Sequence, residues 1–306
     1  MFKYILKRVL IAIPMLIGTM LLIFLILNVL PGNPIAIIGG DKATPDVVKR
    51  ITEQMHLNDP VMVRFFRFLK EAVTLNFGMS FKLKRDVTKM IMTAFPTTAK
   101  LGLLSLLVTW AIGIPAGIIS AIRKNTWVDN VFMGFTFVGI SAPIFWIGLL
   151  LQVVFASKLQ WLPVIGSSSI RHFIMPSFAI GWGMSGGVAR VTRSNLLEVM
   201  RSDYIRTARA KGLKEVSVVV RHALKNSMMP VITIMGMQIP TLLAGAFYTE
   251  TIFGIPGIGR LAVDAINNRD MPLLQGTILF AAMLIIIANI LTDVAYSFVD
   301  PRIRVK

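Results

Sequence analysis

A basic polar segment from Asp203 to Pro230 has the strongest chemical character in a chain that is otherwise largely apolar. The residues from Tyr204 to Lys211 can form a short helix, because Asp203 is a plausible N-terminal cap and Gly212 a natural stop. Two arginines and a lysine make this helix cationic, and two alanines allow another surface to approach it closely. Such a helix could contact an acidic groove on a soluble partner. The alternative is that the charges only fix the orientation of the chain in a membrane.

The sequence contains no recognisable arrangement of residues for catalysis or metal binding. There is no cysteine, which excludes disulfides, thiolate metal sites and cysteine nucleophiles. His56, His172 and His222 are isolated, so no zinc site is predicted. No GxxxxGKS or GxxxxGKT phosphate loop occurs, and the glycines of GIPGIG at 254–259 lack the lysine that would follow. We therefore expect no metal, no cofactor and no ATP hydrolysis on this chain.

The composition is that of an integral membrane protein. Of the 306 residues, 55% are hydrophobic and only 15% are charged, and the mean hydropathy is +0.71. A net charge of +17 could suggest nucleic-acid binding, but the Lys and Arg residues flank apolar runs and no nucleic-acid-binding signature accompanies them. Loop charge that orients a membrane protein explains them better.

Six apolar runs are predicted to cross a bilayer as helices. They cover 9–30, 101–122, 131–157, 173–189, 227–249 and 271–292. The first run lacks a small-residue cleavage site, so we expect it to be retained as a span. The fourth run is shorter and contains Pro176 and several glycines, which predicts close packing or a local distortion. The expected fold is an all-α membrane protein with six transmembrane helices.

The charges of the short loops predict the orientation. Basic residues concentrate on the side of the N-terminus, with nine between Arg190 and Lys225. By the positive-inside rule both termini and the loop 190–226 are cytoplasmic, and the long polar segment after the first span is extracytoplasmic. We expect two parts. Residues 1–97 hold the first span and this outer segment, and residues 98–306 hold a transmembrane domain with five spans.

An amphipathic helix is predicted within the outer segment. Asp59 and Pro60 are a suitable cap and first-turn pair, and apolar residues follow at helical spacing as far as Val73. Two placements are equally compatible with this pattern: the helix lies at the membrane surface, or it belongs to the core of a small appended domain.

Polar residues within the apolar runs are the candidates for a pathway across the membrane. A polar side chain in a bilayer is costly unless it faces a cavity or a partner. The candidates are Gln238, Thr241, Asn289 and Ser141. The alternative for each is a hydrogen bond to a neighbouring helix.

The cytoplasmic segment resembles a known family. The run YIRTARAKGL followed by RHALKNSMMP is similar to the coupling loop, or EAA loop, of importer-type ABC permeases, in the form of the peptide and nickel permease subfamily. In that pattern the glycine falls on Gly212 and the second alanine on Ala208. Arg206 and Thr207 stand where the glutamate and the first alanine would be, and HALK at 222–225 occupies the Ile-x-Leu-Pro positions.

Segments along nearly the whole chain agree with this resemblance. ETIFGIPGIGRL at 250–261 resembles the outer loop between the last two spans of these permeases, and NRDMPLLQG at 268–276 the start of their last span. DPRIR at 300–304 resembles their C-terminus. PGNP at 31–34 and the large outer segment resemble the first of the two permease subunits, the dipeptide/oligopeptide B type.

The resemblance implies an assembly in a bacterial or archaeal cytoplasmic membrane. A second permease subunit of similar fold would complete the pathway, two ATPase subunits would bind ATP and Mg, and an external solute-binding protein would deliver the substrate. Peptides are expected, although the subfamily also carries nickel chelates, haem and some oligosaccharides. The residues that would contact an ATPase are Tyr204, Arg206, Thr207, Ala208, Arg209, Ala210, Lys211 and Gly212.

Other functions fit the sequence less well. A self-contained secondary transporter or channel would need no coupling loop, and there is no evident inverted repeat and no intramembrane acidic relay beyond Asp293. A membrane-embedded enzyme would need a constellation of acid, metal or nucleophile that is missing. In the outer loops, Glu250, Asp264 and Asp270 could engage the binding protein or the amino end of a peptide, but such carboxylates are usually solvated.

Overall fold

A computed structural model describes residues 2–29, 45, 49, 52–53, 58–243 and 246–299. Over these residues the secondary structure is helical, and the β pairing is limited to one antiparallel bridge between Met79 and Asp86. Two segments with family resemblance, at 31–34 and 300–304, lie outside the described residues.

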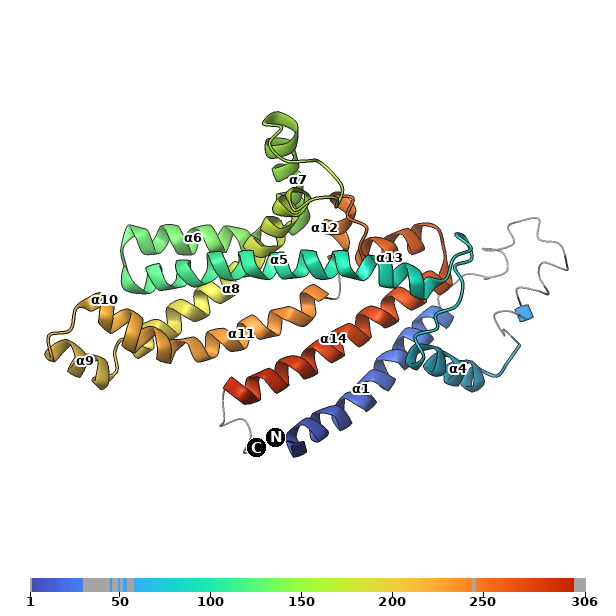
Figure 1. The fold of residues 1–306 in the computed structure, drawn as a ribbon, viewed down its shortest axis with the longest axis horizontal. Helices are drawn as coiled ribbons and strands as arrows, with labels where there is room; N and C mark the ends of the chain where they lie inside the picture. The colour runs from blue at the N-terminus through green and yellow to red at the C-terminus, as the bar shows by residue number, and fades with distance from the viewer. Residues whose placement is uncertain are drawn as a thin grey trace.

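The described residues form an elongated helical bundle. In chain order the α-helices are α1 (Phe2–Val29), α4 (Val61–Val73), α5 (Val87–Ile122), α6 (Trp127–Ser141), α7 (Ile144–Leu151), α8 (Arg171–Val199), α9 (Asp203–Ala210), α10 (Glu215–Ser217), α11 (Lys225–Leu243), α12 (Phe247–Ile252), α13 (Ile258–Asn267) and α14 (Met271–Val299). Two π-helical stretches, η1 (Gln152–Lys158) and η2 (Val218–Leu224), follow α7 and precede α11. Figure 1 shows α9 and α10 at one end of the bundle and α4 and α13 towards the other.

Two helices of the described residues are long and apolar enough to cross a membrane. They are α5 and the Met271–Ala295 part of α14. The bent pair formed by α6 with Ile144–Lys158 makes a third if it counts as one span, and the apolar part of α1, Leu10–Leu25, is shorter. The expectation of six spans therefore stays a prediction.

The helices α5 and α8 pack closely along their length through small residues. A Cβ atom added at Gly113 would lie 2.7 Å from the Ser185 carbonyl oxygen, and one added at Gly117 would lie 2.5 Å from the Ala189 carbonyl oxygen. Only glycine fits at such distances from backbone, and this is how small residues bring membrane helices together. The close packing expected of the fourth apolar run is thus observed.

The third apolar run is not one straight helix. It bends by 104° between α6 and α7. Ala142, which precedes Pro143, has φ −82° and ψ 136° and so leaves the helical region. The proline ring disfavours the α conformation at the residue before it, which ends α6 and lets α7 start in a new direction. The run therefore consists of a helix and a separate apolar arm (Figure 1).

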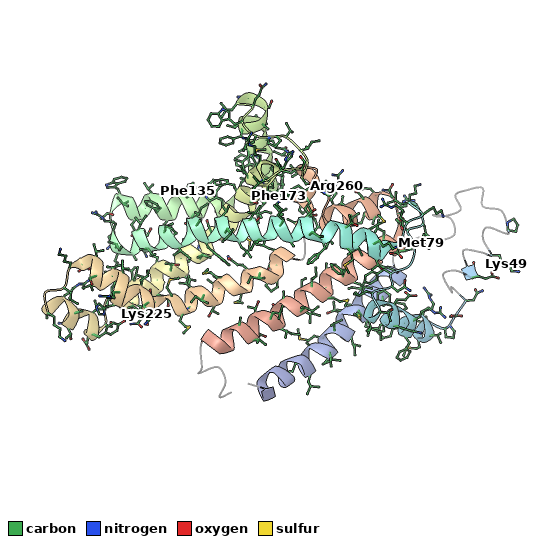
Figure 2. The ribbon with its side chains drawn as sticks, viewed as in Figure 1. Lys49, Met79, Phe135, Phe173, Lys225 and Arg260 are labelled. Carbon is green, nitrogen blue, oxygen red and sulfur yellow. The ribbon has the colours of Figure 1, made fainter. Side chains whose placement is uncertain are left out.

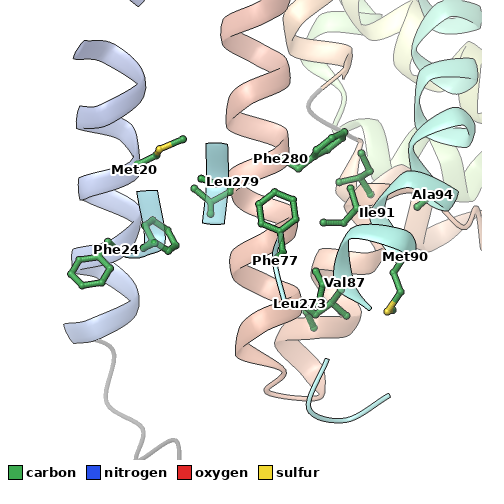
Figure 3. Packing of buried hydrophobic residues seen from close by; sticks show 14 of the residues in the cluster. Met20, Phe24, Phe77, Val87, Met90, Ile91, Ala94, Leu273, Leu279 and Phe280 are labelled. Carbon is green, nitrogen blue, oxygen red and sulfur yellow. The ribbon is translucent and has the colours of Figure 1, made fainter. Parts of the chain in front are cut away.

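The amphipathic helix α4 packs its apolar face on α1. The ring centroids of Phe24 and Phe65 are 5.4 Å apart, and those of Phe24 and Phe68 are 5.6 Å apart. These rings belong to a buried cluster that also contains Val87 and Ile91 of α5 and the start of α14 (Figure 3). The buried face of α4 thus belongs to a core that is shared with the long helices, and not to a small appended domain.

Candidate functional site

The short helix predicted in the basic segment is present as α9, and glycine ends it. Gly212 has φ +75°, in the left-handed region that favours glycine. Its amide donates to the Arg209 carbonyl at 2.9 Å, and the Leu213 amide donates to the Ala208 carbonyl at 3.4 Å, which together make a Schellman motif. At the other end the cap position is Ser202, so Asp203 is the first residue of the helix and not its cap.

The inner face of α9 rests on an apolar cluster. Ile205 is fully buried and Ala208 is 8% exposed. The cluster of buried residues beneath α9 consists of Ala121, Leu196, Ile205, Ala208, Val218 and Ala223. These residues come from α5, α8, α9 and η2, so α9 is attached to the bundle and not suspended in a loop. Ala208 therefore faces the chain's own core, and bulk placed there would disturb this cluster first.

The outer face of α9 is open. Its exposed residues are Tyr204, Arg206, Thr207, Arg209, Ala210, Lys211 and, just beyond, Gly212. The Tyr204 hydroxyl accepts a hydrogen bond from Asn226 Nδ2 at 3.0 Å, which links α9 to α11. Arg206 is 3.6 Å from Asp203, but both side chains are highly exposed, so this pair contributes little stability. Figure 2 places Lys225, the first residue of α11, near this same end of the bundle.

Arg209 is engaged within the segment. Its guanidinium donates to both carboxylate oxygens of Glu215, at 3.0 and 2.6 Å. The hydrogen bonds lower the pKa of Glu215 and raise that of Arg209. This bidentate pair joins α9 to α10 and fixes the turn between them. Of the cationic residues expected to meet a partner, Arg206 and Lys211 therefore remain the more available.

The four candidate pathway residues lie on three different helices. Gln238 on α11 is 9% exposed, and its side-chain amide donates to the Met184 carbonyl of α8 at 3.3 Å. Its Oε1 atom is buried and accepts no hydrogen bond from any described residue. Thr241, Asn289 and Ser141 are exposed, and no side-chain hydrogen bond between described residues joins any two of the four. The structure thus gives Gln238 a helix contact, as the alternative had it, and does not gather the set into one site.

A cavity that the sequence did not indicate lies between α6 and α8. Its volume is about 330 Å³, and it is lined by Met133, Gly134, Thr136, Phe137, Ile140, Gly186 and Arg190. In the sequence Arg190 counts as a loop charge, because the fourth apolar run ends one residue earlier. In the structure α8 continues to Val199, so Arg190 lies within the helix. The helical spacing of Val188, Thr192 and Leu196, which lie on one buried side of α8, was the signal that could have extended α8.

An ion pair between a buried carboxylate and a partly exposed arginine joins α6 to α8 close to this cavity. Arg193 donates to the two carboxylate oxygens of Asp129, from Nε at 2.9 Å and from Nη2 at 2.7 Å. Asp129 is 3% exposed and also accepts the Asn125 amide at 3.0 Å. A bidentate pair of this kind sets both distance and orientation between two helices.

The outer-loop carboxylates are not generally solvated. Glu250 in α12 is fully buried and accepts hydrogen bonds from Thr98 Oγ1 of α5 at 2.8 Å and from the Arg260 amide at 3.0 Å. Burial raises its pKa, although these hydrogen bonds oppose the shift. A Cβ at Gly257 would collide with the Glu250 carboxylate. The glycines of GIPGIG thus admit a buried carboxylate, and Glu250 joins α12, α13 and α5.

Asp270 is likewise buried and serves the fold. It is 2% exposed, it is hydrogen-bonded to the Ser80 hydroxyl, and it accepts the Phe81 and Lys82 amides at 3.2 Å each. Asp264 is the exception. Its side chain is about half exposed, and its ion pair with Arg260 Nε is long, at 3.9 Å. Of the three, only Asp264 fits the expectation of a solvated carboxylate.

We expect Glu250→Ala to lower the free energy of unfolding by about 1–3 kcal/mol, because it leaves the buried Thr98 hydroxyl and the Arg260 amide without an acceptor. Thermal unfolding of the purified chain in detergent measures this. The matched control is Asp264→Ala, which removes an exposed carboxylate from the next helix, α13, and should cause almost no change. Equal effects of the two variants would show that Glu250 does not hold this loop.

Nearly the whole chain matches a known transport family. Residues 113–305 match the family described as binding-protein-dependent transport system inner membrane component, and residues 1–102 match its N-terminal counterpart. The sequence is 38% identical over 332 residues to the dipeptide transport system permease protein DppB of Alkalihalophilus pseudofirmus. This alignment covers 99% of this chain and all of that protein. It is 40% identical over 308 residues to the glutathione transport system permease protein GsiC of Escherichia coli K12, over the full length of both.

Solved structures share the fold at low sequence identity. A chain of the MetNI methionine ABC transporter, in an inward-facing conformation, superposes with a TM-score of 0.58 and 14% identity, over 69% of this chain and 96% of that one. A chain of an amino acid ABC transporter gives a TM-score of 0.53 and 16% identity, over 70% and 94%. The resemblance drawn from the sequence is confirmed: the chain belongs to the family of inner membrane components of binding-protein-dependent transport systems, the permease subunits of ATP-driven importers.

Proposed function

We propose that this chain forms half of the translocation pathway of a peptide importer. The relatives DppB and GsiC are named for dipeptide and glutathione transport, and both substrates are small peptides with free carboxylates. The pathway would be completed by a second permease subunit, and an extracytoplasmic binding protein would deliver the peptide. Two ATPase subunits would bind ATP and Mg, because this sequence has no phosphate loop of its own.

The observation that carries this proposal is the construction of α9. It is a short cationic helix with an exposed outer face, and its inner face is fixed to α5, α8 and η2 through one apolar cluster. If a partner moves this helix, the movement is transmitted to α5, α8 and η2, because α9 is packed on them and does not lie in a flexible loop. We propose that its outer face lies in a groove of one ATPase, and that closing of the ATPase pair moves it between two discrete arrangements.

The proposed topology has six spans and both termini in the cytoplasm. The two ends of the described chain support it, because α1 and α14 pack on each other and run antiparallel (Figure 1). With α9 cytoplasmic, the buried groups Glu250 and Asp270 belong to the outer end of the bundle. Residues 1–97 then form the first span and an outer segment, and residues 98–306 the transmembrane domain.

The test is reconstitution of the complex. The chain is purified with its co-expressed partners, placed in vesicles with the binding protein, and assayed for uptake of labelled alanyl-alanine and for ATP hydrolysis. We expect uptake that requires ATP and hydrolysis that rises when loaded binding protein is added. Uptake by this chain in the absence of any ATPase would instead identify a self-contained secondary transporter or channel.

The outer face of α9 provides a specific prediction. Arg206→Glu is expected to reduce uptake at least about ten-fold, because it reverses the charge offered to the ATPase, while the stability of the exposed site changes by less than about 0.5 kcal/mol. Uptake and thermal unfolding are measured on the same preparation. The control Arg123→Glu reverses an exposed charge outside α9 and should leave uptake near that of the unaltered chain. Normal uptake by Arg206→Glu would exclude this face as the contact.

A further inference from the structure

Three sides of α8 can be assigned to neighbouring helices. The side with Ser185 and Ala189 faces α5, because these residues meet Gly113 and Gly117. Gly186 faces α6, since a Cβ there would lie 2.5 Å from Ile140 Cδ1. Gly187 faces α11, with Ile234 Cδ1 at 3.7 Å. In Figure 1, α5 accordingly lies in front of α8, with α6 above and α11 below.

Arg190 lies on the remaining side. It is four residues after Gly186 and three after Gly187, so on a helix it projects between the directions of α6 and α11. It is exposed, and it makes no hydrogen bond or ion pair with any residue that the structure describes. Arg193, one turn further, is instead held by Asp129. The two arginines thus differ: Arg193 joins α8 to α6, and Arg190 is presented to the cavity between α6 and α8.

The surroundings of Arg190 leave its guanidinium accessible to an anion. The cavity that it lines is otherwise formed mainly by apolar groups, among them Met133, Phe137 and Ile140. The guanidinium is exposed beside this apolar wall and has no counter-charge among the described residues, so an arriving anion can reach it. A planar guanidinium binds a carboxylate through two parallel hydrogen bonds. The cavity is open to the surface, and its volume of about 330 Å³ is large enough to admit the end of a peptide.

We propose that Arg190 binds the terminal carboxylate of a peptide as it passes along the cavity between α6 and α8. This inference rests on the proposed function and adds a substrate contact to it. Every linear peptide has a C-terminal carboxylate, so a site that binds this group accepts peptides with different side chains. The apolar groups of α6 would contact the adjoining side chain, and the flexible thioether of Met133 suits variable shapes.

Direct binding can be tested on the complete complex without its binding protein. A dipeptide that carries a benzophenone side chain and a free carboxylate is photo-crosslinked, and the labelled residues are identified by mass spectrometry. We expect labelling of the cavity wall on α6, competition by alanyl-alanine and no competition by its C-terminal amide. Arg190→Gln should reduce labelling at least about ten-fold, and Arg190→Lys should reduce it less, because a lysine keeps the charge but not the paired donors.

Uptake measured in parallel separates failure of this site from failure of the proposed function. The control variant Arg123→Gln removes an exposed arginine at the turn before α6 and should label normally. If the unaltered complex shows no ATP-driven dipeptide uptake, the proposed function fails. If it takes up dipeptide and Arg190→Gln labels equally well, only the carboxylate site is overturned.

Two other partners for Arg190 give different results, and either would overturn the inference. If Arg190 holds an anionic lipid, uptake by the unaltered complex depends on phosphatidylglycerol in the vesicles, and Arg190→Gln removes that dependence without changing the labelling. If Arg190 pairs with the second permease subunit, Arg190→Gln no longer co-purifies with that subunit.

Discussion

Arg193→Met is expected to lower the free energy of unfolding by about 3 kcal/mol, the low end of the cost of breaking a buried ion pair, because the Arg193 side chain is 27% exposed. The substitution leaves the Asp129 carboxylate, which is 3% exposed, with the Asn125 amide but without its charged partner. An uncompensated buried charge is much more costly than the pair itself is favourable. Because the pair joins α6 to α8, loss of the contact should also loosen the start of α6. Thermal unfolding in detergent and protease sensitivity near Trp127 measure the two effects.

The double variant Asp129→Leu, Arg193→Met is the decisive control. It removes both charges and leaves apolar groups of similar size, so it should recover most of the stability that Arg193→Met loses. Arg201→Met, which removes an exposed arginine at the turn after α8, should be close to neutral. If the double variant is as unstable as Arg193→Met, the cost arises from lost packing of the arginine and not from the stranded carboxylate.

Gly117→Ala is expected to destabilise the bundle by about 1–3 kcal/mol although it adds a single methyl group. The new Cβ would lie 2.5 Å from the Ala189 carbonyl oxygen and 2.6 Å from Thr192 Cβ. Neither atom is the end of a flexible side chain, so α5 and α8 must separate along the contact. The measurement is thermal unfolding, together with co-purification of the second permease subunit.

Gly18→Ala supplies the matched comparison. Gly18 also lies within an apolar helix, α1, but a Cβ there meets no atom within 4 Å. The same change at this position should leave stability unchanged or raise it slightly, because alanine favours helix more than glycine does. If Gly117→Ala were equally neutral, the close approach of α5 and α8 would not contribute to stability.

The sequence predicted those features that depend on local chemistry. Gly212 ends α9 because the chain needs a left-handed backbone conformation there, which glycine adopts without strain. The presence of a glycine at this position was therefore enough to predict the end of the helix. Pro143 ends α6 for a similarly local reason, because proline disfavours the α conformation at Ala142, but the 104° bend that follows depends on where α7 finds its contacts. The family could be predicted from motifs spread along the chain, and the comparisons confirm it.

What the sequence could not predict depends on contacts between distant residues. Glu250 and Asp264 look alike in the sequence, as carboxylates between apolar runs. Only the folded chain shows that Glu250 is buried and hydrogen-bonded to Thr98, whereas Asp264 is exposed. Ala208 matches the family motif, yet whether it faces a partner or its own core depends on Leu196 and Val218. Arg190 looked like a loop charge because hydropathy marks where apolar residues stop and not where a helix ends.

The glycine contact between α5 and α8 also constrains the order in which the protein can be built. The two helices leave the ribosome at different times, with α6 and the arm of α7 made in between. At about 5–20 residues per second, several seconds pass before Ala189 exists to meet Gly117. During that interval the side of α5 that carries Gly113 and Gly117 must be covered by lipid or by α6. The contact between α5 and α8 therefore forms only after α5 has entered the membrane. Its rate of formation should depend on how fast the lipid or α6 is displaced from this side of α5.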